Sequence, residues 1–308
     1  MVSSCYSLIN IKNEIPVTTD FSKYNIYKGN PSDLIPTHDY QLFELSSTLF
    51  TDYAEKQRLI KLPIGKKITA NGDGLPIFPD STILVKTFYY FKDKRDYSKG
   101  KKLMETRIMI KLKGKWNMDT YVWNEAQTNA NLQTTGFDKS VVWVDILGKT
   151  NTINYHIPSH TECTSCHQKA NNILPIGPKL RNLNIEIIEN GTTENQLVKF
   201  QKSGIINEFD HHKITKLPDW KNTNNTLSER GRAYFEVNCA HCHNKEGLSA
   251  KTKLLLDFET TVDKSHIKKR KKFIIARMSA KSYRMPKLGT TIIHKEGLEL
   301  VKAYINTL

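Results

Sequence analysis

Short segments in which apolar side chains alternate with polar ones fill the first half of the chain. Residues 82–91 and 105–112 are rich in β-branched and aromatic side chains, which favour strands. Shorter segments of the same kind cover residues 121–123, 141–144 and 153–155. Turn-forming residues separate the segments, among them Gly114 and the run 71–74. The pattern predicts a β-rich, sandwich-like domain over residues 33–157.

The segments that flank this domain have a different character. Residues 1–32 are polar and end in a turn signal, so we expect an N-terminal tether. One helix is predicted at about 46–61, before the strands. From residue 158 the pattern changes to helix and loop. A first segment covers 158–225, and its end at 217–225 has the composition of a linker. A strongly helical region follows over 226–308. The predicted fold class is therefore α+β with several domains.

The composition is that of a soluble globular protein. The chain has 308 residues, of which 38% are hydrophobic and 25% charged, and this is typical of neither a disordered chain nor a membrane bundle. No apolar run approaches the ~18 residues that a membrane-spanning helix needs. Lysine and arginine exceed aspartate and glutamate by 46 to 31, which gives a net charge of +15. Such an excess favours an anionic partner, whether nucleic acid, a lipid surface or an acidic protein.

Four of the five cysteines stand in two motifs of one form, Cys-x-x-Cys-His. The motif residues are Cys163, Cys166 and His167 in the first, and Cys239, Cys242 and His243 in the second. Two thiols at this spacing can form thioethers with the two vinyl groups of one porphyrin, and the adjacent histidine can then ligate the iron. The sequence therefore predicts two covalently bound haem c groups.

Two other uses of cysteine pairs fit this sequence less well than haem attachment. A four-cysteine zinc site is usually built from pairs ~15–20 residues apart. Here the pairs lie much further apart, at 163–166 and 239–242. A thioredoxin-like redox pair needs a βαβ context, which the sequence does not show around either pair. Haem is the better interpretation, because a histidine follows each pair directly.

The surroundings of the second motif strengthen the haem prediction. A helix is predicted over 227–238, and it places Gly231, Phe235 and Cys239 on one face. This helix resembles the N-terminal helix of class I cytochromes c, in which the glycine permits a close crossing by the C-terminal helix. Residues 297–305 have the helical spacing of such a partner. The resemblance implies a class I cytochrome c fold for the C-terminal region.

Met285 is the candidate sixth ligand of the second haem. It stands before Pro286 in a loop that resembles the one carrying the distal methionine in the same cytochromes. A thioether is a soft ligand that favours Fe(II) and raises the reduction potential. Met278 is its rival, and simple core packing is the other common use of a methionine.

The first motif has fewer recognisable surroundings. Residues 174–180 follow His167 at the distance where class I cytochromes carry a Gly-Pro-x-Leu loop, here Gly177 to Leu180. The resemblance implies that the carbonyl of Pro178 accepts a hydrogen bond from the His167 imidazole. The sequence leaves the sixth ligand open, and a five-coordinate iron is one alternative. The candidate ligands are His156, His160, His211, His212, Met104, Met109 and Met118.

Taken whole, the chain resembles a family of bacterial periplasmic dihaem c-type cytochromes in which a β-rich domain precedes two such motifs. The similar segments are 49–56, 105–107, 121–128, 158–159 and 238–243. The resemblance implies electron transfer and a location in the periplasm or on the outer surface of a bacterial membrane. Cys5 follows Val-Ser-Ser, as at the end of a lipoprotein signal, so a lipid anchor is expected there, with a stray terminal cysteine as the alternative.

These features predict an electron carrier whose partner is another redox protein. The alternative is a haem enzyme such as a dihaem peroxidase, with the first haem open to substrate, and a third class is a binding module that docks through the β-rich domain. The basic run 264–272 is interpreted as a solvated face that steers an acidic redox partner rather than as a nucleic-acid site. Tempting site residues in the β-rich domain are interpreted mainly as core, because aromatic side chains in strands usually are. They are Trp116, Trp123, Trp143 and Glu125.

Overall fold

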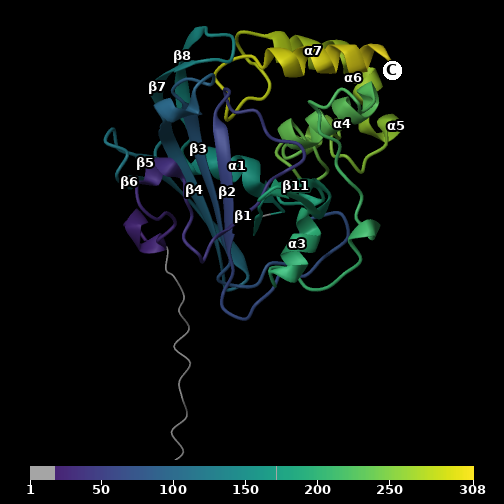
Figure 1. The fold of residues 1–308 in the computed structure, drawn as a ribbon. Helices are drawn as coiled ribbons and strands as arrows, with labels where there is room; N and C mark the ends of the chain where they lie inside the picture. Colours follow the sequence, from purple (N-terminus) through teal and green to yellow (C-terminus); the bar gives the residue numbers. More distant parts are fainter. Residues whose placement is uncertain (1–17, 171) are drawn as a thin grey trace, which may run out of the picture.

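The computed structural model describes residues 18–170 and 172–308, which form a mixed α and β structure (Figure 1). Cys5, the expected lipid-anchor residue, lies outside these residues. The described strands are β1 (Gln41–Leu42), β2 (Glu55–Lys61), β3 (Ile83–Phe91), β4 (Lys101–Leu112), β5 (Lys115–Trp123), β6 (Ala130–Gln133), β7 (Phe137–Val144), β8 (Thr150–Ile157), β9 (Gln168–Lys169), β10 (Asn172–Ile173), β11 (Glu186–Glu189) and β12 (Thr192–Asn195). The described helices are α1 (His160–His167), α2 (Leu180–Leu183), α3 (Gln196–Lys202), α4 (Leu227–Asn238), α5 (Val262–Ser265), α6 (Ile267–Ser279) and α7 (Lys295–Asn306). None of these helices is long and apolar enough to cross a membrane.

Strands β1 to β6 form one antiparallel sheet whose strand order follows the sequence (Figure 1). The strands predicted at 82–91 and 105–112 are confirmed as β3 and β4. Between β4 and β5, Lys113 and Gly114 have φ angles of +50° and +76°, which suit a tight two-residue hairpin turn. β7 and β8 pair with each other as a separate hairpin.

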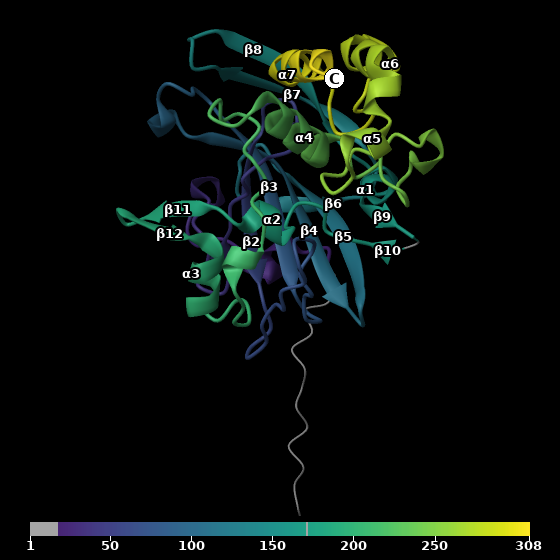
Figure 2. The same cartoon turned by 90° about the vertical axis from the view of Figure 1, so that its right-hand side faces the viewer.

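The two faces of the sheet are covered by different parts of the chain. On one face, side chains such as Ile83 pack with the N-terminal residues Phe21 and Tyr24. On the other face, Phe88 packs against the β7–β8 hairpin, and Leu84 packs against the segment that carries the first motif. Figure 2, viewed from the helical side, shows helices α2 to α5 in front of the sheet. The first motif therefore lies between the sheet and the C-terminal helices.

The tether prediction is wrong for the part that the structure describes, residues 18–32. Phe21 and Tyr24 stand in a short 3-10 helix and are buried. The hydroxyl groups of Tyr24 and Tyr121 are hydrogen-bonded at 3.0 Å, which fastens this segment to β5. The tether prediction followed the polar composition of the segment and did not consider its aromatic side chains, which cover an apolar face of the sheet.

The helix predicted at 46–61 is also wrong. The segment begins as irregular chain with a turn at Asp52 and Tyr53 and ends as strand β2. Its backbone groups bond to distant residues, as when the Phe50 N–H donates to the side chain of Asn238 at 2.8 Å. The Asp52 carboxylate accepts from the Thr291 N–H at 2.7 Å. Partners that are remote in the sequence replace the i to i−4 bonds of a helix, and the segment ties the sheet to the C-terminal region.

The predicted helices at 227–238 and 297–305 are confirmed as α4 and α7, and they cross at two glycines. A Cβ atom on Gly231 would lie 2.4 Å from the ring of Tyr304, and one on Gly297 would lie 2.2 Å from the hydroxyl of Tyr234. Each helix therefore places a tyrosine over the glycine of the other. The close crossing expected at Gly231 is confirmed, and Gly297 makes it reciprocal.

The segment 217–225 is not simply a linker. Leu217 and Trp220 are buried in the core of the C-terminal region. The Trp220 ring packs edge-on against Tyr234, with ring centroids 5.4 Å apart. Its backbone N–H donates to the hydroxyl of Ser47 at 3.1 Å. A core aromatic residue thus fixes the path of a segment whose Asn-rich end looks flexible in the sequence.

Candidate functional site

The first motif lies on helix α1, whose N-terminus is firmly capped. The Ser159 hydroxyl accepts from the Glu162 N–H at 3.2 Å, and the Glu162 carboxylate accepts from the Ser159 N–H at 2.8 Å. This capping box satisfies two backbone donors that a helix start leaves unpaired. Cys163, Cys166 and His167 are three and four positions apart, so they share one face of the helix. The helix therefore holds both thiols and the imidazole as one set.

The ring of His167 is oriented by a backbone carbonyl. Its Nδ1 donates to the carbonyl of Leu174 at 2.8 Å, and the Leu174 N–H donates back to the carbonyl of His167 at 2.9 Å. The expected acceptor, Pro178, is therefore wrong, because the β9–β10 hairpin brings Leu174 opposite the histidine. A carbonyl only accepts, so the hydrogen lies on Nδ1 and Nε2 keeps its lone pair.

Burial keeps His167 neutral. It lowers the pKa of His167 to about 3, with a further contribution from Lys86. A neutral imidazole with a lone pair on Nε2 is the form that ligates a metal.

A cavity of about 160 Å³ separates helix α1 from the sheet. Cys163, Cys166 and His167 line it from the helix, and Met109 and Met118 line it from the sheet. A second cavity, of about 850 Å³, borders Cys166 and His167 from the other side. Cys166 and His167 are therefore accessible from two directions.

The second motif begins where α4 ends. Cys239 is the C-cap of the helix, and its carbonyl accepts from the backbone N–H groups of Cys242 and His243 at 3.1 and 2.9 Å. These bonds fold the motif into a tight turn. Burial lowers the pKa of His243, so this imidazole is also neutral, and its buried Nδ1 has no hydrogen-bond partner among the described residues. The nearby Leu254 backbone opposes the shift, as the Leu174 carbonyl does for His167.

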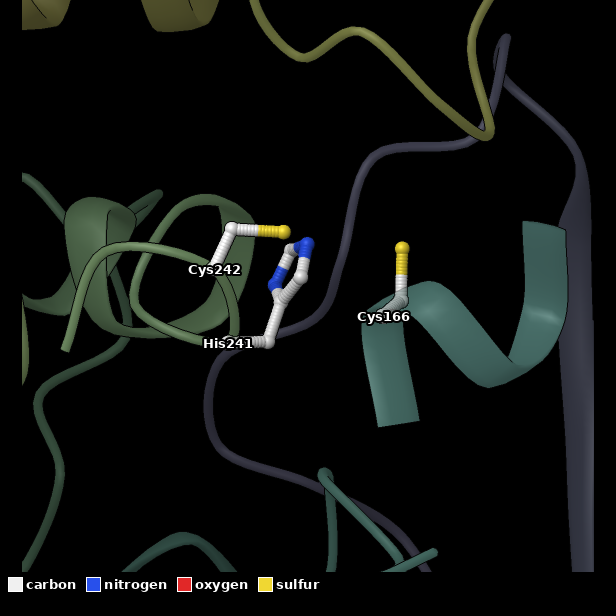
Figure 3. A group of neighbouring side chains, drawn as sticks. All are labelled: Cys166, His241 and Cys242. Carbon is white, nitrogen blue, oxygen red and sulfur yellow. The ribbon is translucent and has the colours of Figure 1, made fainter. Parts of the chain in front are cut away.

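The two motifs meet at Cys166, His241 and Cys242. One ligand atom of each lies within 4.8 Å of those of the other two. Figure 3 shows the His241 ring between the sulfur of Cys242 and that of Cys166, with Cys166 on α1 and the other two on the turn after α4. His241 was not singled out in the sequence, where it is only the second variable residue of a motif.

The arrangement does not form the four-cysteine zinc site. Among the described residues, Cys163 and Cys239 are absent from the group around His241. Cys163 instead lies buried beside the Thr120 hydroxyl, at 3.9 Å. Two thiols and an imidazole could hold Zn²⁺ or Cu(I). Such a site would leave both motif histidines, His167 and His243, without a role.

The structure separates the candidate sixth ligands of the first motif. Met109 and Met118 are directly opposite each other on β4 and β5, and both line the cavity that His167 borders. Met104 faces the β7–β8 hairpin and does not line it. None of the four candidate histidines lines this cavity. They are otherwise engaged or lie at the surface, as His156 shows by its bond to Asp138 at 2.7 Å.

Met285 and its rival Met278 lie beside each other. Both line a small cavity of about 10 Å³, together with His294. Met278 is buried in the core on α6, whereas Met285 is half-buried in the following loop. The Met285 N–H donates to the carbonyl of Arg277 at 3.0 Å, and Arg277 is also one of the groups that lower the pKa of His243. The loop is thus anchored to the helix that approaches the second motif histidine.

The tempting residues of the β-rich domain are of two kinds, three buried tryptophans and one exposed glutamate, which is not core as expected. Trp116, Trp123 and Trp143 are buried in three different core clusters, so their interpretation as core is confirmed. The Glu125 side chain is 72% exposed and pairs with Lys139 at 2.8 Å. It lines none of the cavities beside the motifs.

The basic run on α6 is exposed. Lys268, Lys269 and Lys272 all face solvent, as does the neighbouring Phe273. Lys268 lies 3.5 Å from Asp263, and this is the ion pair that the structure shows for the run. The interpretation of this run as a solvated face is therefore confirmed, and most of its charge is free to act on a partner.

No family model, curated protein or solved structure matches this chain. The resemblance to dihaem cytochromes therefore rests on the motif residues and their surroundings alone.

Proposed function

We propose that this chain is a dihaem c-type cytochrome that transfers electrons. In this proposal the thioethers form at Cys163 and Cys166 and at Cys239 and Cys242, and the proximal ligands are His167 and His243. The observation that carries it is the juxtaposition of two complete motifs, in which the sulfur atoms of Cys166 and Cys242 lie within 4.8 Å of each other. Haem iron supplies one-electron chemistry between Fe(II) and Fe(III). Neighbouring attachment points favour exchange between two such centres.

The residues around the first motif suit this chemistry. Burial keeps His167 neutral, and the Leu174 carbonyl fixes its tautomer and orientation. The cavity between α1 and the sheet offers Met109 and Met118 as thioether ligands opposite the histidine-bearing helix. We propose that one of them is the sixth ligand, which would leave no open position for a substrate. At the second motif we propose Met285, whose loop is anchored beside α6.

The C-terminal region supports the same proposal through its helix crossing. Gly231 on α4 and Tyr304 on α7 meet as the class I cytochrome c pattern implies. We therefore propose that residues 226–308 form such a domain, and that the α6 face docks an acidic redox partner. A periplasmic or outer-surface location follows from covalent haem attachment and belongs to the proposal.

A haem enzyme such as a dihaem peroxidase is the second candidate. The cavity of about 850 Å³ beside Cys166, His167 and His241 favours it, because a substrate could approach the first motif there. Carbon monoxide binding separates the two candidates. A carrier with two thioether-ligated haems binds it poorly when reduced, whereas an enzyme with an open iron binds it at once at one haem.

The experiment that tests the proposal is expression alongside a haem-attachment system. We expect a red protein whose haem survives denaturation and whose oxidised spectrum has the weak sulfur-to-iron band at the red end of the visible range. Met285→Ala should weaken that band and Met278→Ala should spare it. If the opposite holds, the second haem uses Met278. A colourless, zinc-containing protein would contradict the proposal.

A further inference from the structure

Three cationic side chains form a row across the middle of the sheet. Arg58 on β2 is paired in register with Lys86 on β3, and Lys86 is paired with Arg107 on β4. Residues directly opposite in neighbouring strands point to the same face, so the three side chains stand side by side. All three line the cavity between α1 and the sheet. Lys56 is two residues before Arg58 on β2, so it points to the same face, and it also lines the cavity.

The described carboxylates balance only part of this charge. Glu105 holds Arg107 with two hydrogen bonds, of 2.9 and 2.6 Å. Glu44 lies 3.8 Å from Arg58, and its side chain is half exposed. Lys86 forms no ion pair with any described carboxylate, and its ammonium group lies over the ring of Phe88 at 5.1 Å.

Lys56 is in a similar position. Its ammonium group donates to the Ala54 carbonyl at 2.9 Å and forms no ion pair with a described carboxylate. Burial lowers its pKa well below the usual lysine value, and lowers that of Lys86 to about 7. Like charges directly opposite each other destabilise a sheet, and buried unpaired charges do so more strongly. Such a row is typical of a site that receives an anion.

The row beside the cations is apolar and also faces the cavity. Leu84, Met109 and Met118 stand opposite one another on β3, β4 and β5. Leu84 is two residues from Lys86 on β3, and Met109 is two residues from Arg107 on β4. The sheet thus presents an apolar strip and a cationic strip next to each other. The ligand that matches both has a flat apolar body and carboxylates at one edge.

We infer that Arg58, Lys86 and Lys56 bind the propionate carboxylates of the haem at the first motif. The inference rests on the proposed function and adds the residues that receive the acidic edge of the group. Cys163 lies on the facing wall of the same cavity. Charge-assisted hydrogen bonds of this kind are about twice as strong as neutral ones, so they would fix the rotation of the group in its plane.

The test uses the full chain prepared without haem attachment, with protoporphyrin IX and its dimethyl ester as probes. The ester has the same flat body without the negative charges. Binding is followed by porphyrin fluorescence. We expect the wild-type chain to prefer the free acid by about tenfold, the effect of one charge-assisted bond. Lys86→Met should remove most of this preference and leave ester binding unchanged.

Lys115→Met is the matched control, because Lys115 is an exposed lysine of the same sheet that does not line this cavity. It should leave the preference intact. Lys56→Met provides a second variant if Lys86→Met does not fold. An equal preference in wild type and both cavity variants would overturn the inference, and so would displacement of the acid porphyrin by millimolar phosphate alone. Failure of the proposed function is a separate result, namely no covalent haem after attachment.

Discussion

The sulfur atoms of Cys166 and Cys242 lie within 4.8 Å of each other, although they belong to motifs far apart in the sequence. One stands on α1 against the sheet, and the other stands on the turn after α4 (Figure 3). The β-rich part and the C-terminal helices thus place their candidate attachment points side by side. His241 lies between the two sulfur atoms and borders the cavities of about 160 and 850 Å³. The two motifs therefore lie side by side rather than in separate regions of the molecule.

This juxtaposition predicts that the two haems influence each other's reduction potential. An electron on one haem adds negative charge next to the other, which makes the second reduction less favourable. Removing the second haem with Cys239→Ala and Cys242→Ala should therefore shift the potential of the first by on the order of 50 mV, near the 59 mV of a tenfold change for one electron. Potentiometric titration with visible detection measures this. Identical potentials in the wild type and the variant would mean that the centres are independent.

The facing methionines, Met109 and Met118, are the proposed source of the sixth iron ligand of the first haem. Met109→Leu and Met118→Leu are nearly volume-conserving, so each should cost less than about 1.5 kcal/mol of stability. One of them should convert the first haem to a high-spin or carbon monoxide-binding form, because it removes the thioether. Met104→Leu on the same strand is the control, since Met104 does not line the cavity. The comparison is best made in the variant that lacks the second haem. Unchanged spectra in all three variants would leave the first haem with another ligand.

The crossing of α4 and α7 predicts a large effect from one methyl group. Gly231→Ala would place a Cβ 2.4 Å from the Tyr304 ring, so the helices must separate. The expected loss of stability is about 1–3 kcal/mol, measured by denaturant unfolding. Gly74→Ala is the control, because its Cβ would meet nothing closer than 3.9 Å. A loss no larger than that of the control would show that the crossing is loose.

The exposed α6 run predicts a salt-dependent reaction with an acidic redox partner. Reversing Lys268, Lys269, Lys271 and Lys272 to Glu should slow electron exchange at low salt and flatten its dependence on ionic strength. The Debye length is only ~8 Å at physiological salt, so the effect on the wild type should fade there. Stopped-flow mixing with an acidic electron acceptor measures the rate. Reversal of four exposed lysines outside the run, Lys28, Lys66, Lys113 and Lys115, changes the net charge equally and serves as the control. Equal slowing in both variants would assign the effect to net charge alone.

Local patterns predicted much of the fold. The spacing of apolar residues identified α4 and α7, and the β-branched segments identified β3 and β4, because these elements bury one side against a neighbour. The helix predicted at 46–61 was wrong, because the hydrogen-bond partners of its backbone, such as Asn182 and Asn238, come from remote parts of the chain. Periodicity contains no information about such partners.

The candidate site shows the same division. The two motifs could be identified from the sequence, because their chemistry depends on spacing within five residues. The approach of Cys166 to Cys242, and the place of His241 between them, depend on how two distant segments pack. The sequence does contain one indication of the cationic row. Side chains alternate along a strand, so Lys86 lies on the same face as the apolar Leu84, and this predicts a lysine on the covered face of the sheet. The strand register, which the sequence does not give, is needed to show that Arg58 and Arg107 lie directly beside Lys86.

The most direct test of the account is a count of covalent haem, motif by motif. Intact mass of the denatured chain and the pyridine haemochrome assay should both give two haems for the wild type. Cys163→Ala with Cys166→Ala should leave one, Cys239→Ala with Cys242→Ala should leave one, and all four substitutions together should leave none. Cys5→Ala is the control and should keep both. A wild-type chain that carries no covalent haem, or one whose count does not fall when a motif is removed, would contradict the central claim.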